Sequence, residues 1–276
     1  MKTNVIVFLI GVITVLGTVS CASVPNEIDE SLDYGVFLSL EGSQAIEASE
    51  GYKTVVIDAQ NLSKAEIAEM QARGQEVYSY LNVGSLETFR PYYEDYQQYT
   101  LTLYEDWEEE YWIDVTEKDW QTFSAVTLAK EFLDKGIEGF WIDNVDVYGQ
   151  FPTKETYAGV EHILKTLMSY EKPVVINGGD EFVSAYLQQN HQADDILSGV
   201  NQETVFSAID FKENNFGTQT NENQTYYLDY LNTLDEAGKD IFLLEYTTDS
   251  RIIKEINAYA TKRGWKYYIS DSIELD

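Results

Sequence analysis

The chain repeats one pattern eight times: a short apolar run followed by a stretch with helical periodicity. The runs are YGVFLSL (34–40), YKTVVIDAQ (52–60), EVYSYLNVGS (76–85), GFWIDNVD (139–146), KPVVINGG (172–179), DILSGVNQE (195–203), DIFLLEYTT (240–248) and WKYYISD (265–271). Most are almost continuously apolar, as parallel strands covered on both faces require. Strands and helices that alternate eight times predict an α/β protein with one domain, a (β/α)8 TIM barrel.

The segments between the runs end where helices can close. Gly74, Gly136, Gly238 and Gly264 each stand just before the next apolar run. Glycine adopts the left-handed conformation that ends a helix without a steric penalty, so these positions predict helix ends. The first link, residues 41–51, is short for a full helix, and we expect an irregular connection there.

An insertion rich in aromatic residues separates the third and fourth runs, over residues 86–125. It carries Tyr92, Tyr93, Tyr96, Tyr99, Tyr104, Trp107, Tyr111 and Trp112. Aromatic faces stack on sugar rings, and their polar tips bond hydroxyl groups. We expect some of these rings to pack beneath the insertion and others to face a ligand.

The N-terminal 21 residues resemble a secretory signal. Lys2 precedes an apolar run over residues 5–16, and small residues then lead to Cys21, the only cysteine. This segment is too short and one-sided for a stable membrane span. GTVSC resembles a bacterial lipobox, which predicts an extracellular protein held at the membrane only by a lipid on Cys21. Simple cleavage and release is the alternative. Residues 22–32 are then a tether, and residues 33–276 form the barrel.

The charge balance limits the partners. The chain has 18 basic and 48 acidic residues, a formal net charge of -30. Such a surface repels nucleic acid and anionic lipid, and it favours cationic or neutral partners. Solubility alone is the alternative reason for the charge. We expect a monomer that binds no nucleic acid.

Polar side chains stand near the end of every apolar run after the first. They are Asp58, Asn82, Asp143, Asn177, Glu203, Glu245 and Asp271. The carboxyl ends of barrel strands converge on one face, where active sites are built. A single polar residue at a strand end often only marks where the strand stops, but seven carboxylates and amides together predict a site.

Carboxylates are the only catalytic groups that the pattern supplies. His162 lies in a helical stretch and His191 in a polar loop, so neither is placed for a zinc site or a Ser-His-Asp triad. Two carboxylates across a barrel mouth are the machinery of glycoside hydrolysis, which needs no metal or cofactor.

The letters GGDEF, residues 178–182, match the signature of diguanylate cyclases. Here they follow the fifth apolar run and lead into a helical pattern, with no Arg or Lys between Gly178 and Lys212. We interpret Gly178 and Gly179 as a tight strand-to-helix turn and Asp180 as the helix cap. The functional residue is then Asn177, at the strand end.

Four blocks resemble the family 114 glycoside hydrolases, the endo-α-1,4-polygalactosaminidases. They are SYLNVGSLETFRPYY, EYWIDVTEKDWQ, GIEGFWIDNVDVY and GVNQETVF. The blocks occur in the family's order and span roughly residues 33–271. The resemblance implies a barrel that cleaves α-1,4-linked, galactosamine-rich polysaccharide internally.

The resemblance also implies the catalytic pair, Asp143 and Glu203. We predict a retaining mechanism with Asp143 as nucleophile and Glu203 as acid/base, and the reverse assignment stays open. Glu245 is the rival for the acid/base role, and it otherwise binds a substrate amine.

Matching positions imply the remaining site residues. We expect substrate to be bound by Asp58, Tyr80, Asn82, Asp114, Asn144, Asp146, Asn177 and Glu245. Arg90 supports the site by holding a carboxylate such as Glu87 or Asp114. Two alternatives stay open: a non-catalytic carbohydrate-binding lipoprotein on the same barrel, and a hydrolase for another glycan.

Overall fold

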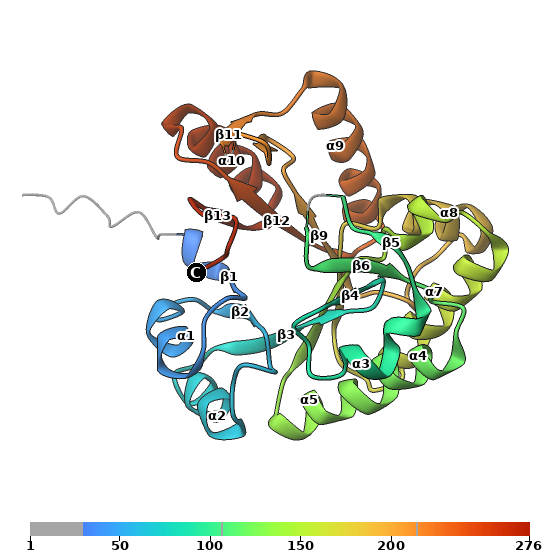
Figure 1. The fold of residues 1–276 in the computed structure, drawn as a ribbon. Helices are drawn as coiled ribbons and strands as arrows, with labels where there is room; N and C mark the ends of the chain where they lie inside the picture. The colour runs from blue at the N-terminus through green and yellow to red at the C-terminus, as the bar shows by residue number, and fades with distance from the viewer. Residues whose placement is uncertain (1–29, 106, 214) are drawn as a thin grey trace, which may run out of the picture.

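The computed structural model describes residues 30–105, 107–213 and 215–276 (Figure 1). Cys21, the predicted signal and most of the predicted tether lie outside them. The first described element is a short 3-10 helix, η1 (Glu30–Asp33), directly before the first strand. Within the described residues, no helix combines the length and the apolar character needed to cross a membrane.

Eight parallel strands form the barrel, which confirms the predicted fold. They are β1 (Tyr34–Phe37), β2 (Thr54–Ile57), β3 (Glu76–Asn82), β7 (Gly139–Asp143), β8 (Val174–Asn177), β9 (Gly199–Glu203), β12 (Asp240–Tyr246) and β13 (Lys266–Ser270). Each strand pairs with the next in chain order, and β13 contacts β1. The C terminus lies beside β1 (Figure 1), where the amide of Leu38 donates to the carbonyl of Leu275 at 3.0 Å.

Helices cover the outside of the barrel (Figure 1). They are α1 (Gly42–Ala48), α2 (Lys64–Ala72), α4 (Lys118–Thr122), the π-helix η3 (Phe123–Leu128), α5 (Ala129–Lys135), α6 (Val147–Gln150), α7 (Lys154–Met168), α8 (Asp180–Asn190), α9 (Asn221–Glu236) and α10 (Ser250–Arg263). The four glycines predicted to end helices all have left-handed φ, between 72° and 105°. The first link is more regular than expected, because it contains the seven-residue α1.

Two antiparallel additions stand at the carboxyl end of the strands. The insertion forms a three-stranded sheet in the order β4 (Ser85–Glu87), β6 (Glu110–Ile113), β5 (Thr100–Leu103), with α3 (Tyr93–Tyr96) and η2 (Gln97–Tyr99) in between. A hairpin, β10 (Ser207–Asp210) and β11 (Asn215–Thr218), follows β9. The sequence did not predict this hairpin, because its strands are short and lack a clear alternation of apolar residues. Trp107 and Phe211 bring the two additions into edge-to-face contact, with ring centroids 6.1 Å apart.

The aromatic residues of the insertion have mixed environments, as expected. Trp112 is buried and stacks on Tyr104 with ring centroids 4.4 Å apart. Trp107 is 40% exposed. The insertion therefore has its own packed layer and also presents a ring to solvent.

A second, smaller core fills the barrel interior. It is separate from the large core between strands and helices, and its strand residues are mostly large: Tyr34, Val36, Val56, Tyr78, Tyr80, Trp141, Val175, Phe242, Leu244 and Tyr246. Inward-facing rings of this size fill the barrel and form the floor beneath any site at its carboxyl end.

Gly84 allows the end of β3 to touch the loop after β7. A Cβ built on Gly84 would lie 1.7 Å from the carbonyl oxygen of Asn144. The neighbouring amide of Val83 donates to the carbonyl of Asp143 at 3.2 Å. This close backbone approach fixes the position of Asp143, and only glycine permits it.

We predict that Gly84→Ala destabilises the protein by about 2–3 kcal/mol or more, because the new methyl group clashes with backbone that cannot move aside. Urea unfolding measures the change. Gly217→Ala is the matched control, since its added Cβ meets nothing within 4 Å. Equal stability of the two variants would contradict the close approach.

Candidate active site

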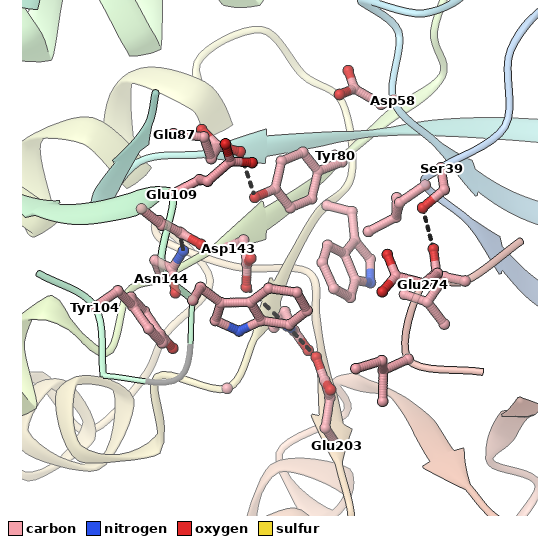
Figure 2. A pocket seen from close by; sticks show the side chains of 18 of the residues that line it. Ser39, Asp58, Tyr80, Glu87, Tyr104, Glu109, Asp143, Asn144, Glu203 and Glu274 are labelled. Atoms are coloured by element: carbon pink, nitrogen blue, oxygen red, sulfur yellow. Dashed lines mark hydrogen bonds between the residues drawn. The ribbon is translucent and has the colours of Figure 1, made fainter. Parts of the chain in front are cut away.

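A cavity of about 1120 Å³ opens at the carboxyl ends of the strands (Figure 2). Its walls come from the strand ends, the insertion, the β10–β11 hairpin and the C-terminal segment. Nine residues that the sequence analysis selected line it: Asp58, Tyr80, Glu87, Arg90, Asp143, Asn144, Asp146, Asn177 and Glu203. The structure thus gathers most of the predicted site in one place.

One amide joins the two carboxylates. Nδ2 of Asn177 donates to Oδ1 of Asp143 at 2.9 Å and to Oε1 of Glu203 at 2.8 Å. Those two oxygens are therefore at most 2.9 Å plus 2.8 Å, about 5.7 Å, apart. Asp143 ends β7, Asn177 ends β8 and Glu203 ends β9, so three neighbouring strands build the centre. Asp143 lies near the middle of Figure 2, with Glu203 below it.

A chain of buried hydrogen bonds sets the direction of this amide. Nε1 of Trp141 donates to the hydroxyl of Tyr34 at 2.9 Å, and that hydroxyl donates to Oδ1 of Asn201 at 3.1 Å. Nδ2 of Asn201 then donates to Oδ1 of Asn177 at 2.7 Å. Because the carbonyl of Asn177 is used in this bond, its NH₂ group must face the two acids.

This chain of buried hydrogen bonds was not predicted from the sequence. Trp141 lies two residues before Asp143, and Asn201 lies two residues before Glu203. Residues two apart in a strand share a face, so this spacing was the available signal. Trp141 was counted only as part of an apolar run, and Asn201 was not distinguished from the polar end of its strand.

Residues with a left-handed backbone conformation directly follow Asp143, Asn177 and Glu203. The φ angles are 62° at Asn144, 65° at Gly178 and 53° at Thr204. The chain thus turns sharply after each central side chain. Such a conformation is strained for the β-branched Thr204, which marks the end of β9 as a place where surrounding contacts impose the geometry.

Burial raises the pKa values of the acid pair. The pKa of Asp143 lies well above its usual value because the carboxyl is desolvated, and the charge of Glu203 adds to this. Burial also raises the pKa of Glu203, while hydrogen bonds with Asn177 and Tyr246 oppose the rise. Both carboxyls therefore bind a proton more tightly than a free carboxyl group does.

Asp146 is a third acid at this face. Burial raises its pKa to about 6, although a hydrogen bond from the amide of Gly179 opposes the shift. Oδ1 accepts that bond at 3.1 Å and so holds the turn between β8 and α8. Gly178 and Gly179 are both left-handed, as the interpretation of this turn requires. Asp180 is not the cap, however, because α8 begins at this residue, its N-cap is Gly179 and no side chain bonds the cap.

A buried ion-pair network forms another wall. Arg90 bonds Oδ2 of Asp58 at 2.5 Å and Oε1 of Glu87 at 2.8 Å. The hydroxyl of Tyr80 also donates to Oε1 of Glu87, at 3.2 Å (Figure 2). Arg90 therefore holds Glu87 in place, as expected, and its second partner is Asp58 and not Asp114.

Three predicted substrate-binding residues lie outside the cavity lining. Glu245 is fully buried, and its carboxylate accepts backbone N–H bonds from Val205, Phe206 and Ser207. A carboxylate used in this way holds the loop after Glu203 and is not free to bind substrate or to transfer a proton.

Asp114 and Asn82 also make local contacts. Oδ1 of Asp114 accepts the amide of Thr116 at 2.9 Å, within a turn. Nδ2 of Asn82 donates to Oγ of Ser85 at 2.6 Å and to Oε1 of Glu110 at 3.0 Å. Asn82 thus supports Glu110, a cavity residue that the sequence analysis did not select. Glu110 belongs to an acidic stretch of the insertion, and nothing in that composition distinguishes it.

Within the part of the chain that the structure describes, no three His, Cys, Asp or Glu residues converge as a metal site would need. The carboxylates of this cavity face amides, hydroxyls and one guanidinium group. The arrangement offers two acids with raised pKa values at short separation, beside walls that can hydrogen-bond a ligand.

We predict that lowering the pH from 7.5 to 5.5 stabilises the protein. The buried carboxyls bind protons more tightly in the folded chain than in the unfolded chain, where their pKa is about 4. Stability is therefore lost as the pH rises from about 4 through the folded values, about 6 for Asp146.

The variant Asp143→Asn removes one of these groups. It should be more stable than the parent chain at pH 7.5 by on the order of 1 kcal/mol, with a weaker pH dependence. Urea unfolding at several pH values measures both, and the exposed variant Glu105→Gln controls for net charge. A pH slope unchanged by Asp143→Asn would contradict the burial argument.

Solved structures share this architecture. The glycoside hydrolase domain of PelA from Pseudomonas aeruginosa has a TM-score of 0.72 at 18% identity, over 88% of this chain and 96% of that one. Aspergillus fumigatus Ega3, solved in complex with galactosamine, has a TM-score of 0.69 at 16% identity, over 89% and 93% of the two chains. An α-galactosidase from Thermus thermophilus is more distant, with a TM-score of 0.55 at 11% identity, over 85% and 57%. At these identities the likeness shows the fold.

Sequence comparison identifies the family. No curated protein matches the chain significantly. The profile of glycoside-hydrolase family GH114, however, matches residues 20–275, which include almost every described residue. The chain therefore belongs to glycoside-hydrolase family GH114 and is a glycoside hydrolase.

Proposed function

We propose that this protein cleaves α-1,4-linked, galactosamine-rich polysaccharide with retention of anomeric configuration, outside the cell, either released or anchored through Cys21. The observation that carries the mechanism is the bond from one amide nitrogen to both Asp143 and Glu203. Retaining glycosidases place their carboxyl groups about 5–5.5 Å apart and inverting ones about 6.5–9.5 Å apart. An upper limit of about 5.7 Å between the two bonded oxygens supports retention.

In the proposed reaction, a carboxylate oxygen of Asp143 attacks the anomeric carbon. Glu203 gives its proton to the glycosidic oxygen, the carbon–oxygen bond breaks, and a covalent glycosyl ester forms. Glu203 then takes a proton from water, which attacks the same carbon and releases Asp143. Burial raises the pKa of both acids, which supports the presence of the carboxylic acid that the first step needs.

The substrate class is supported by charge and by the family. Ega3 was solved with galactosamine, an amine that is protonated near neutral pH. Carboxylates at the cavity of this chain include Asp58, Glu87, Glu108, Glu109, Glu110, Asp146 and Glu274. Together with the net charge of -30, they favour a cationic polymer.

We predict that Asp143→Asn and Glu203→Gln each lower the rate of hydrolysis of deacetylated polygalactosamine by at least about 10³-fold, because each removes one of the two reacting groups. New reducing ends measure the rate. The exposed variant Glu131→Gln should retain it. Polymer binding without new reducing ends, in the parent chain and in the variants alike, would instead support a carbohydrate-binding protein.

Azide separates the two roles. With an activated galactosaminide, azide should rescue Asp143→Asn and give the product of inverted configuration, since it replaces the nucleophile directly. It should rescue Glu203→Gln with retained configuration, since it attacks the glycosyl ester. Proton NMR identifies the products. The opposite pair of outcomes would exchange the two roles.

We also predict that activity on the cationic polymer falls severalfold between about 10 mM and about 150 mM salt, because screening weakens attraction to the acidic cavity. The rate on a neutral polymer, if one is cleaved, should change little. Equal rates on the cationic polymer at the two salt concentrations would exclude electrostatic steering.

A further inference from the structure

Glu110 presents one carboxylate oxygen to the protein and the other to no described residue. Its Oε1 accepts bonds from Nδ2 of Asn82 at 3.0 Å, from Nδ2 of Asn144 at 2.9 Å and from the hydroxyl of Ser85. Among the described residues, none bonds Oε2. Glu110 lines the cavity, so a rigidly held carboxylate has a free oxygen at the site.

Glu87 lies directly opposite Glu110. The two residues are register partners on the antiparallel strands β4 and β6. Such partners point to the same face, with Cβ atoms about 4.5–5.5 Å apart, and like charges in these positions are destabilising. The charge of Glu87 accordingly contributes, after burial, to a raised pKa of Glu110.

Glu87 also has an oxygen without a partner. The residue is 5% exposed, yet Oε2 bonds no described group, while Oε1 is used by Arg90 and Tyr80. A buried charged oxygen left unpaired costs stability, and a positive charge bound nearby would reduce this cost. Arg90 cannot compensate for this wall alone, since it already pairs with Asp58.

We propose that Glu87 and Glu110 form a binding site for the protonated primary amine of a 2-amino sugar. An ammonium group has three donors and one positive charge, so it can bond the free oxygen of Glu110 and relieve the repulsion between the two acids. This inference rests on the proposed function for its substrate, but it is tested separately.

The amine site is joined to the catalytic centre by one residue. Asn144, which bonds Glu110, directly follows Asp143 in the chain. A sugar whose amine is held here is therefore held close to the nucleophile. An N-acetyl group carries no charge and a single N–H donor, so it leaves the two carboxylates uncompensated, and the site selects against acetylated units.

Glu110→Gln tests the site, because glutamine keeps an acceptor for Asn82, Asn144 and Ser85 and replaces the free charged oxygen by a neutral NH₂ donor. We expect KM for deacetylated galactosamine oligomers to rise about 10- to 100-fold, as loss of one charged hydrogen bond implies. The rate on partly acetylated oligomers should fall much less. Glu87→Gln should act in the same direction, which guards against misfolding of one variant.

Glu105→Gln is the matched control, since it removes an exposed charge of the same insertion outside the cavity lining. It should leave both KM values unchanged. If Glu110→Gln and Glu87→Gln also leave the preference for deacetylated oligomers unchanged while hydrolysis continues, the amine site is wrong and the proposed function stands.

A binding experiment tests the amine site without relying on hydrolysis. Calorimetry on the folded Asp143→Asn variant compares D-galactosamine with N-acetyl-D-galactosamine. We expect tighter binding of the amine, and loss of this preference when Glu110→Gln is added. If the parent chain cleaves no aminosugar polymer but this preference is found, the proposed function fails and the amine site stands. Equal binding of the two sugars would overturn the amine site.

Discussion

The side-chain amide of Asn177 holds together two carboxylates that would otherwise repel each other. It can do so because its own carbonyl is engaged by Asn201, which is oriented in turn by Tyr34 and Trp141. Each hydrogen bond in this series allows the side chain that accepts it only one orientation. The direction of the amide between the two acids is therefore set inside the barrel, below the cavity.

The loops join this centre by backbone contact. Gly84 touches the carbonyl of Asn144, and Asn144 reaches across to Glu110 on the inserted sheet. Glu245 holds the loop after β9 through three backbone amides. Rigid strand ends thus position Asp143, Asn177 and Glu203, while the insertion and the hairpin complete the walls.

Several features of the cavity are unfavourable for the stability of the folded protein. It contains several carboxylates with raised pKa values, a like-charged pair across β4 and β6, and a buried oxygen of Glu87 with no described partner. Such features lower the stability of the free protein and are retained where a ligand can compensate for them. A cationic sugar polymer would supply that compensation, so the acidic wall and the proposed substrate are explained by the same electrostatics.

The sequence by itself determined the barrel and its eight strands, and the family resemblance implied the proposed catalytic pair. Continuous apolar runs, glycines at helix ends and polar residues at strand ends are local signals, and the closed barrel follows from their regular repetition. Only the tertiary structure decided which polar residues face the cavity. Glu245 and Glu203 look alike in sequence as acids near strand ends, yet the backbone amides of the loop after β9 enclose the first and leave the second beside Asn177. Glu110 lies in a run of acids, and only its pairing with β4 and its contacts with Asn82 and Asn144 set it apart. Contacts between residues that are distant in the chain decide which side chains face the cavity, so a local sequence pattern does not predict them.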